Sequence, residues 1–294
     1  MPLLSVLLIL CGLAIFLYPT VSNYFAERNF VRAIKTYDNK VAEMDTEAIN
    51  AAWQEAKEYN ENLSGDPVHD PFVPGSGYAL PDNYESVLNL NGDGIMGYIE
   101  IPKIDIMLPI YHGADEQVLQ NGVGHIQQTA LPIGGTRRNA VLSAHRGLPS
   151  AELFTHLDKM KIGDYFYIYV LDKTLAYKVV EIKTIKPTEL ESLNAYADED
   201  RVTLLTCTPY AVNTHRLLVI GERTEYIAPE ETKYITDTTV NFVGIDVRIQ
   251  QLGIIIGAAI VVLIIFIVLI IWLIAKKRKK RRRADETDDI INGS

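Results

Sequence analysis

The chain has 294 residues, a formal net charge of −9 and two cysteines, and its length suits one domain with appendages. Without the eight basic residues 276–283 and the four acidic residues after them, the rest of the chain has a net charge of −13. A main domain this acidic is not expected to bind nucleic acid. The two cysteines are Cys11, which lies in an apolar segment, and Cys207. The main domain therefore has a single thiol, which excludes an internal disulfide there and zinc sites of the paired-cysteine type.

Residues 1–21 predict a membrane anchor or signal segment. The run from Leu3 to Tyr18 is apolar apart from Ser5, which is short for a membrane span and close to the core of a signal peptide. No basic residue precedes it and the cleavage-site pattern after it is poor. We therefore expect an uncleaved anchor, with a removed signal peptide as the alternative; either one exports the residues that follow.

Residues 22–62 predict two helices. Apolar residues such as Phe30, Ile34 and Tyr37 recur at three- and four-residue spacing, and Asp45 is a good N-cap for a second helix. We expect an antiparallel helical hairpin packed on the main domain. The heptads are too few to favour a coiled-coil partner surface.

Residues 63–80 are rich in proline and glycine, which excludes regular structure and indicates a loop or linker. Residues 89–100 nearly match a calcium-binding EF-hand loop, but Asn89 replaces the usual aspartate and no helix flanks the motif. We expect a turn that enters the first strand of the main domain. We expect no metal ion and no cofactor anywhere in the chain.

Residues 81–228 predict a β domain. Short apolar runs separated by turn residues indicate strands at 95–101, 104–111, 139–145, 164–171, 174–187, 202–207 and 216–222. Short helices are expected at 114–121 and 150–157. Many short strands at close spacing indicate a closed barrel or a sandwich.

The C-terminal part predicts a second membrane anchor. After a juxtamembrane linker at 229–251, residues 252–275 are uncharged, and 24 residues of helix span about 36 Å. The basic run that begins the tail, residues 276–294, is expected to hold that tail in the cytoplasm. The domain between the two anchors should then lie outside the cell.

The strongest chemical signal is Cys207, at the end of an apolar strand that Pro209 terminates. Arg216 opens the next apolar run nine residues later, so the two strands should lie side by side and bring thiol and guanidinium together. A thiol beside a fixed cation favours the thiolate, which is the reactive form. The alternative is a small buried hydrophobic residue without chemistry.

A nucleophilic cysteine also needs a histidine. His145 is the best candidate because it lies at the end of the expected apolar strand 139–145. Its neighbours in sequence supply no evident carboxylate or amide partner. His215 should face away from Arg216, because adjacent strand residues point to opposite faces. We expect structural or solvated roles for His112, His125 and His156, and the role of His69 stays open.

These residues carry a resemblance. The run Thr203–Cys207 reads TLLTC and matches the TLxTC signature of sortases, with Arg216 and the Ser143-Ala144-His145 strand also in place. The chain resembles class C, pilus-assembling sortases, which are cysteine transpeptidases of Gram-positive bacteria. The resemblance implies a mainly β fold: an eight-stranded sortase-type barrel with short helices, an N-terminal helical hairpin and two terminal transmembrane helices.

The resemblance also implies site residues. Cys207, His145 and Arg216 would be catalytic. Thr206, which precedes the nucleophile and is assigned to the substrate cleft, is expected to pack or hydrogen-bond within its strand. Class C sortases carry a lid with an Asp-Pro-aromatic motif, which Asp70-Pro71-Phe72 fits. In the family that aspartate pairs with the catalytic arginine and the aromatic ring covers the cysteine.

By the same resemblance, the enzyme would cleave LPxTG-type sorting signals between Thr and Gly and pass the acyl group to a pilin lysine. Its partners would be pilins or surface proteins and the cell membrane, with no nucleic acid. One alternative is a sortase that anchors proteins to the cell wall. The other is a non-enzymatic, membrane-tethered β-domain scaffold with an inert cysteine.

Overall fold

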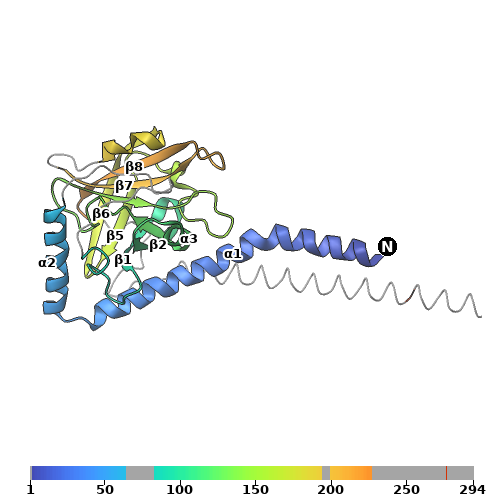
Figure 1. The fold of residues 1–294 in the computed structure, drawn as a ribbon, viewed down its shortest axis with the longest axis horizontal. Coiled ribbons are helices and arrows are strands. Elements are labelled where there is room, and N and C mark those ends of the chain that lie inside the picture. The colour runs from blue at the N-terminus through green and yellow to red at the C-terminus, as the bar shows by residue number, and fades with distance from the viewer. Residues whose placement is uncertain (1, 64–82, 194–198, 227–275, 277–294) are drawn as a thin grey trace, which may run out of the picture. The chain divides into compact units, whose positions relative to one another are not determined.

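The computed structural model describes residues 2–63, 83–193, 199–226 and 276, and within them eight strands form one closed barrel (Figure 1). The strands are β1 (Ile95–Ile101), β2 (Ile106–His112), β3 (Val123–His125), β4 (Arg138–Ser143), β5 (Tyr165–Val170), β6 (Lys173–Ile185), β7 (Asp200–Thr208) and β8 (His215–Thr224). Their order around the barrel is β1-β2-β3-β4-β7-β8-β6-β5, with β2–β3 and β4–β7 parallel and the other pairs antiparallel. The expected mainly β, eight-stranded barrel is therefore confirmed.

The strand β3 was not expected, because three residues are too few to show a periodicity in the sequence. The barrel needs this strand, since it joins β2 on one side and β4 on the other. Three residues are enough to bridge two neighbours whose backbone groups would otherwise lack partners.

Alternate residues of each strand face opposite sides of the barrel wall. Val202 and Leu204 of β7 and Val219 of β8 belong to a cluster of buried residues that includes members of all eight strands and of the helices. Leu205 of β7 and Leu218 of β8 belong instead to a smaller cluster on the outer side of the same strands. The wall formed by β4, β7 and β8 is thus buried on both faces.

The helix α1 (Pro2–Glu43) continues through Pro19, where the sequence suggested a boundary between an anchor and a separate helix. Its Phe30, Ile34 and Tyr37 are buried at helical spacing. The Tyr37 hydroxyl donates to the Met96 carbonyl at 3.2 Å and accepts from the Leu171 backbone N–H at 2.8 Å. These two hydrogen bonds fix the helix against the barrel.

The helix α2 (Thr46–Asn62) begins after Asp45, whose carboxylate accepts from the Ala48 N–H at 2.8 Å, as expected of an N-cap. The expected antiparallel hairpin is wrong, because α2 turns across the end of α1 instead of folding back along it (Figure 1). The reason is that α2 has its own contacts with the barrel side. Asn60 accepts from the Leu131 N–H at 2.7 Å, and Tyr59 packs in the barrel core.

The short helix α3 (Glu116–Asn121) confirms the helix expected at 114–121, but the helix expected at 150–157 is wrong. That segment forms turns followed by a 3-10 helix, Leu157–Lys159. Leu153 has a φ of 42°, which a right-handed helix does not allow. Because Phe154 is not in a helix, its N–H can donate to the His145 carbonyl at 3.1 Å. Further 3-10 helices span Pro102–Ile104 and Pro187–Leu193.

The loop that resembles a calcium site is a turn into β1, as expected. The Asn89 side chain accepts from the Gly94 N–H at 3.0 Å, and the Asp93 carboxylate accepts from the Ile95 N–H at 3.1 Å. Both oxygens thus stabilise the turn itself.

Both expected membrane segments were inferred from sequence alone. Within the residues described, no helix combines the length and the apolar character needed to cross a membrane. The expected linker 229–251, the span 252–275 and the tail after Lys276 lie outside the described residues. So does residue range 64–82, which contains the expected lid.

His125 has the structural role that the sequence suggested. It is fully buried, with Nδ1 2.9 Å from the Tyr84 hydroxyl and Nε2 2.8 Å from the Ala130 carbonyl oxygen. Burial lowers the pKa of His125 to about 3. The neutral ring satisfies both contacts when Nε2 donates and Nδ1 accepts from Tyr84.

We expect this histidine to make folding sensitive to acid. Because the pKa of His125 is about 3 in the folded state and about 6.5 when unfolded, only the unfolded chain takes up the proton as pH falls below 6.5. Stability should fall by about 2 kcal/mol between pH 7 and pH 5 from this group. Urea unfolding of the full chain in non-ionic detergent should show a smaller loss for His125→Gln and an unchanged loss for His156→Gln. Equal pH dependence in all three proteins would contradict the assignment.

Candidate active site

The pair that the sequence singled out is brought together by strand register. Cys207 of β7 and Arg216 of β8 are directly opposite each other in the antiparallel pair. Residues directly opposite on antiparallel strands point to the same face, with Cβ atoms about 5 Å apart. Both residues are buried, with exposed fractions of 6% and 4%. The thiol and the guanidinium therefore share one side of the barrel wall.

That side is the outer one. Leu205 and Leu218 precede and follow the pair by two residues along their strands, and both belong to the outer cluster. Side chains alternate along a strand, so Cys207 and Arg216 continue the same face. The site therefore lies outside the barrel interior, where a substrate can reach it without opening the core.

His145 is positioned by the parallel pairing of β4 with β7. The last pair of this ladder is Ser143 with Leu205, and the Ala144 N–H still donates to the Leu205 carbonyl at 3.2 Å. Continuing this register by two residues places His145 beside Cys207. The three residues predicted as catalytic thus come from β7, β8 and the segment directly after β4, which lies beside β7.

Thr206 fixes the backbone just before His145. Its hydroxyl is fully buried and donates to the Ala144 carbonyl at 2.7 Å. Together with the bond from Phe154 to the His145 carbonyl, this contact holds the chain on both sides of the histidine. The expected hydrogen bond within the strand is instead made to the segment that follows the neighbouring strand β4.

Arg216 is held by its own turn. Its Nη1 donates to the Asn213 carbonyl at 3.1 Å and to the His215 carbonyl at 3.0 Å. A guanidinium is a rigid, planar group, so these two bonds orient it. His215 is next to Arg216 on β8 and therefore points to the opposite face of the sheet. Its Nδ1 lies 2.9 Å from the Thr214 hydroxyl oxygen.

Sequence reasoning missed Glu116 at this site. The carboxylate oxygen Oε1 of Glu116 lies 3.6 Å from Nε2 of His145. Glu116 opens α3, which enters the site from another part of the chain, and no local pattern links it to the histidine. With 71% of the Glu116 side chain exposed, the pair is a surface ion pair of small energy when His145 is protonated.

Sequence reasoning also missed Arg146, which joins the segments that follow the histidine and the cysteine. Its side chain is 8% exposed and lies 2.6 Å from the Asp158 carboxylate. Its Nη1 donates to the Thr208 hydroxyl at 3.0 Å and its Nε to the Thr155 carbonyl at 3.2 Å. Arg146 follows His145 directly and Thr208 follows Cys207 directly. The guanidinium therefore couples the positions of the two predicted catalytic residues.

The remaining expectations for the site concern the lid and metal binding. The lid residues Asp70, Pro71 and Phe72 lie outside the described residues. No group of three or more His, Cys, Asp or Glu side chains in the described part of the chain is arranged to hold a metal ion.

Comparisons with known proteins place this arrangement in a family. The model of the Sortase domain family matches residues 99–224, which include all three predicted catalytic residues. A crystal structure of sortase C from Streptococcus pneumoniae is similar with 43% sequence identity and a TM-score of 0.62, covering 67% of this chain and 99% of that one. Sortase C-1 from Actinomyces oris has 43% identity and a TM-score of 0.58, covering 61% of this chain and 99% of that one.

A curated relative gives a more distant match. Sortase A of Listeria monocytogenes is 31% identical over 149 residues, which cover 50% of this chain and 65% of that protein. The match therefore spans just under two thirds of that relative's length.

We expect Arg146→Lys to slow acylation of Cys207 by a sorting-signal peptide about tenfold at saturating peptide, with little change in KM. A lysine can replace only one of the three contacts at a time, so His145 and Cys207 would lose their common support. Stopped-flow acylation of the full chain in detergent measures this. Arg137→Lys, in the exposed loop before β4, is the matched control.

A second variant separates positioning from general destabilisation. Asp158→Asn keeps the Arg146 bonds to Thr155 and Thr208 and should retain most of the rate. Folded Arg146→Lys protein that acylates at the wild-type rate would refute the positioning role.

Proposed function

We infer that this chain, which belongs to the sortase family of cysteine transpeptidases, cleaves an LPxTG-type sorting signal and transfers the acyl group to a pilin lysine. The observation that carries the proposal is the pairing of Cys207 with Arg216 across β7 and β8, with His145 in the segment that directly follows the neighbouring strand β4. These are the nucleophile, the proton carrier and the fixed cation that thiol-based acyl transfer needs.

In the first step, the Cys207 thiolate attacks the carbonyl carbon of the threonine in the signal. The carbonyl becomes a tetrahedral oxyanion, and the bond from its carbon to the glycine nitrogen then breaks. Protonated His145 gives its proton to the departing amine. The products are a thioester on Cys207 and a free peptide that begins with glycine.

Arg216 is suited to stabilise the oxyanion. Two of its donors are already bound to the carbonyls of Asn213 and His215, so the group is oriented before substrate arrives. A buried, oriented cation stabilises developing negative charge more than a mobile one in water does. Directly opposite Cys207, it is on the face where that charge would form.

In the second step, an amine attacks the thioester. Its nitrogen bonds to the carbonyl carbon, the Cys207 thiolate leaves, and His145 receives the surplus proton. A lysine side chain as this amine would produce an isopeptide bond between protein subunits. The similarity to sortase C structures favours a pilin lysine, because the Streptococcus pneumoniae enzyme is described with pilin substrate specificity and a Group B Streptococcus sortase C2 belongs to a pilus island.

The competing acceptor is an amine of the cell-wall precursor, as in a wall-anchoring sortase. The sequence similarity to sortase A is lower than that to the sortase C structures, at 31% against 43% identity. Competition for the thioester between a pilin peptide containing lysine and a peptide with a free N-terminal amine would distinguish the two acceptors.

The place of the enzyme in the cell is also a proposal, and it rests on the sequence. We place residues 1–21 and 252–275 in the cell membrane, the barrel outside the cell and the basic tail in the cytoplasm. The lid role of Asp70, Pro71 and Phe72 rests on the resemblance to class C sortases. An antibody against the tail should label permeabilised cells only; labelling of intact cells would overturn this topology.

The decisive test is the intact mass of the full chain in detergent after incubation with an LPxTG peptide. We expect a mass increase equal to the acyl fragment in the wild-type protein or in Asp70→Ala, which should open the lid. Cys207→Ala should show none, because the only thiol left in the chain, Cys11, lies in the expected N-terminal membrane anchor. Absence of an adduct in both proteins, together with a Cys207 inert to alkylation, would favour the scaffold alternative.

A further inference from the structure

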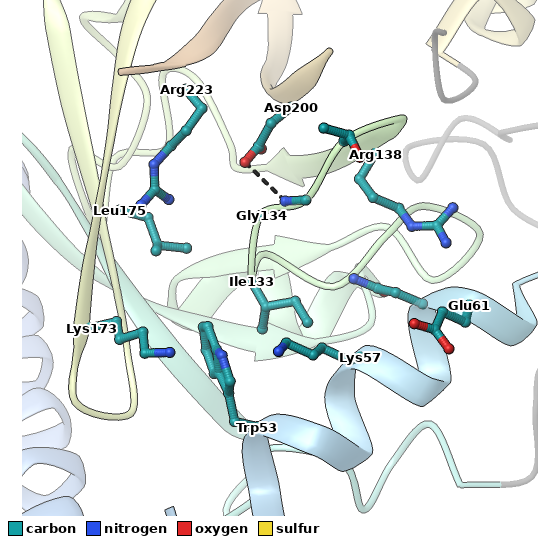
Figure 2. Close-up of a pocket in the computed structure, with 13 residues that line it drawn as sticks. Trp53, Lys57, Glu61, Ile133, Gly134, Arg138, Lys173, Leu175, Asp200 and Arg223 are labelled. Carbon is teal, nitrogen blue, oxygen red and sulfur yellow. Dashed lines mark hydrogen bonds between the residues drawn. The ribbon is translucent and has the colours of Figure 1, made fainter. Parts of the chain in front are cut away.

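A second concave site lies between α2 and the barrel. It is a cavity of about 730 Å³ lined by α2, the loop 133–136, and the near ends of β6, β7 and β8 (Figure 2). This volume is within the range of about 300–1,000 Å³ that ligand pockets occupy. Segments from five parts of the chain converge there.

This cavity is distant from the predicted catalytic residues. Asp200, which lines it, is paired with Arg138 at the beginning of the β4–β7 ladder, whereas Cys207 and His145 are at its other end. Cys207 is the seventh residue after Asp200 along β7, roughly 23 Å away on an extended strand. A ligand in the cavity would therefore not occupy the catalytic site.

The cavity is lined by an excess of positive charge in an otherwise acidic protein. Its lining includes the four cations Lys57, Arg138, Lys173 and Arg223, against only two carboxylates. In the described part of the chain, none of the four forms a salt bridge with a carboxylate. Lys173 is instead stacked on Trp53, with Nζ 4.2 Å from the ring centroid.

One of the two carboxylates already has partners within the fold. Asp200 accepts from the Gly135 N–H at 2.9 Å and from the Tyr177 hydroxyl at 3.1 Å. Gly134 has a φ of 74°, and a Cβ there would lie 2.8 Å from the Asp200 carboxylate. Glycine is thus required at this turn. Asp200 holds the loop and also interacts electrostatically with Arg223, so the other three cations make up the excess of positive charge.

The cations are spread around the opening instead of converging on one point. In Figure 2, Lys173 and Arg223 lie on one side, Arg138 on the other and Lys57 between them, over the apolar side chains of Ile133 and Leu175. Because the cations come from different segments of the cavity wall, a chain that carries several carboxylates matches their arrangement better than a single small anion does. The apolar side chains suit the aliphatic parts of such a chain.

We propose that this cavity binds an acidic peptide segment. Resting on the proposed function, the natural source would be an acidic stretch in the body of the protein substrate, bound at a distance from its sorting signal. Such a contact would help the enzyme select whole substrate proteins over other chains with the same short signal. The net charge of −9 would otherwise repel an acidic partner.

Trp53 makes binding measurable. The chain has two tryptophans, so Trp272→Phe leaves Trp53 as the only one in the full chain. A carboxylate that draws Lys173 from the indole face should change the Trp53 emission. We expect saturable change with acetyl-tetraglutamate in detergent at low salt, and little change with acetyl-tetraglutamine or with inorganic phosphate at equal ionic strength.

Matched variants locate the effect. In the same background, Lys57→Gln with Arg138→Gln should weaken tetraglutamate binding about three- to tenfold, as expected for exposed charges. Lys103→Gln, an exposed lysine of the 3-10 helix Pro102–Ile104, should leave it unchanged. All these proteins should acylate Cys207 with a short LPxTG peptide at the same rate, because the cavity is far from the predicted catalytic residues.

The outcomes separate this proposal from the proposed function. Absent tetraglutamate binding, equal weakening by Lys103→Gln, or a preference for phosphate would each overturn the acidic-peptide site, whatever the acylation result. Cavity-dependent tetraglutamate binding in a protein that never acylates Cys207 would support the site and refute the transpeptidase proposal.

Discussion

The register between β7 and β8 is the constraint on which the catalytic geometry depends. It sets Cys207 opposite Arg216, and the parallel pairing of β4 with β7 adds His145 on the other side. A slip of one residue would move a side chain to the opposite face of the wall, so register and chemistry cannot vary independently. The closed barrel protects this register, because every strand of the wall has a neighbour on both sides.

Buried polar contacts add a second level of control. Thr206 and Arg146 bind backbone and side-chain groups next to His145 and Cys207, and both side chains are largely withdrawn from water. A buried polar group that lacks a hydrogen-bond partner costs free energy, so conformations that break these contacts are disfavoured. They explain how catalytic groups on a strand end and in a loop can be held as firmly as residues inside a strand.

The two ends of the β4–β7 ladder have different properties. At one end, an apolar outer cluster leads to the thiol and its neighbours; at the other, glycine turns and exposed cations surround a cavity. The helix α2 matters for the second end, since it supplies Trp53 and Lys57. In the proposed function this separation would keep the chemistry at one end and the proposed peptide-binding cavity at the other.

The sequence by itself determined the barrel strands, the cap of α2 and the three catalytic candidates, because alternation, capping residues and the short spacing of Cys207 and Arg216 are local patterns. It did not reveal the strand β3, the roles of Glu116 and Arg146, or the cation-lined cavity. These depend on which distant segments meet, as when α3 reaches His145 or α2 reaches the ends of β6 and β8. Tertiary contacts also decided the direction of α2, which the hydrogen bond between Asn60 and Leu131 holds against the barrel. At 150–157 the hydrogen bond from Phe154 to His145 outweighs the local preference for a helix.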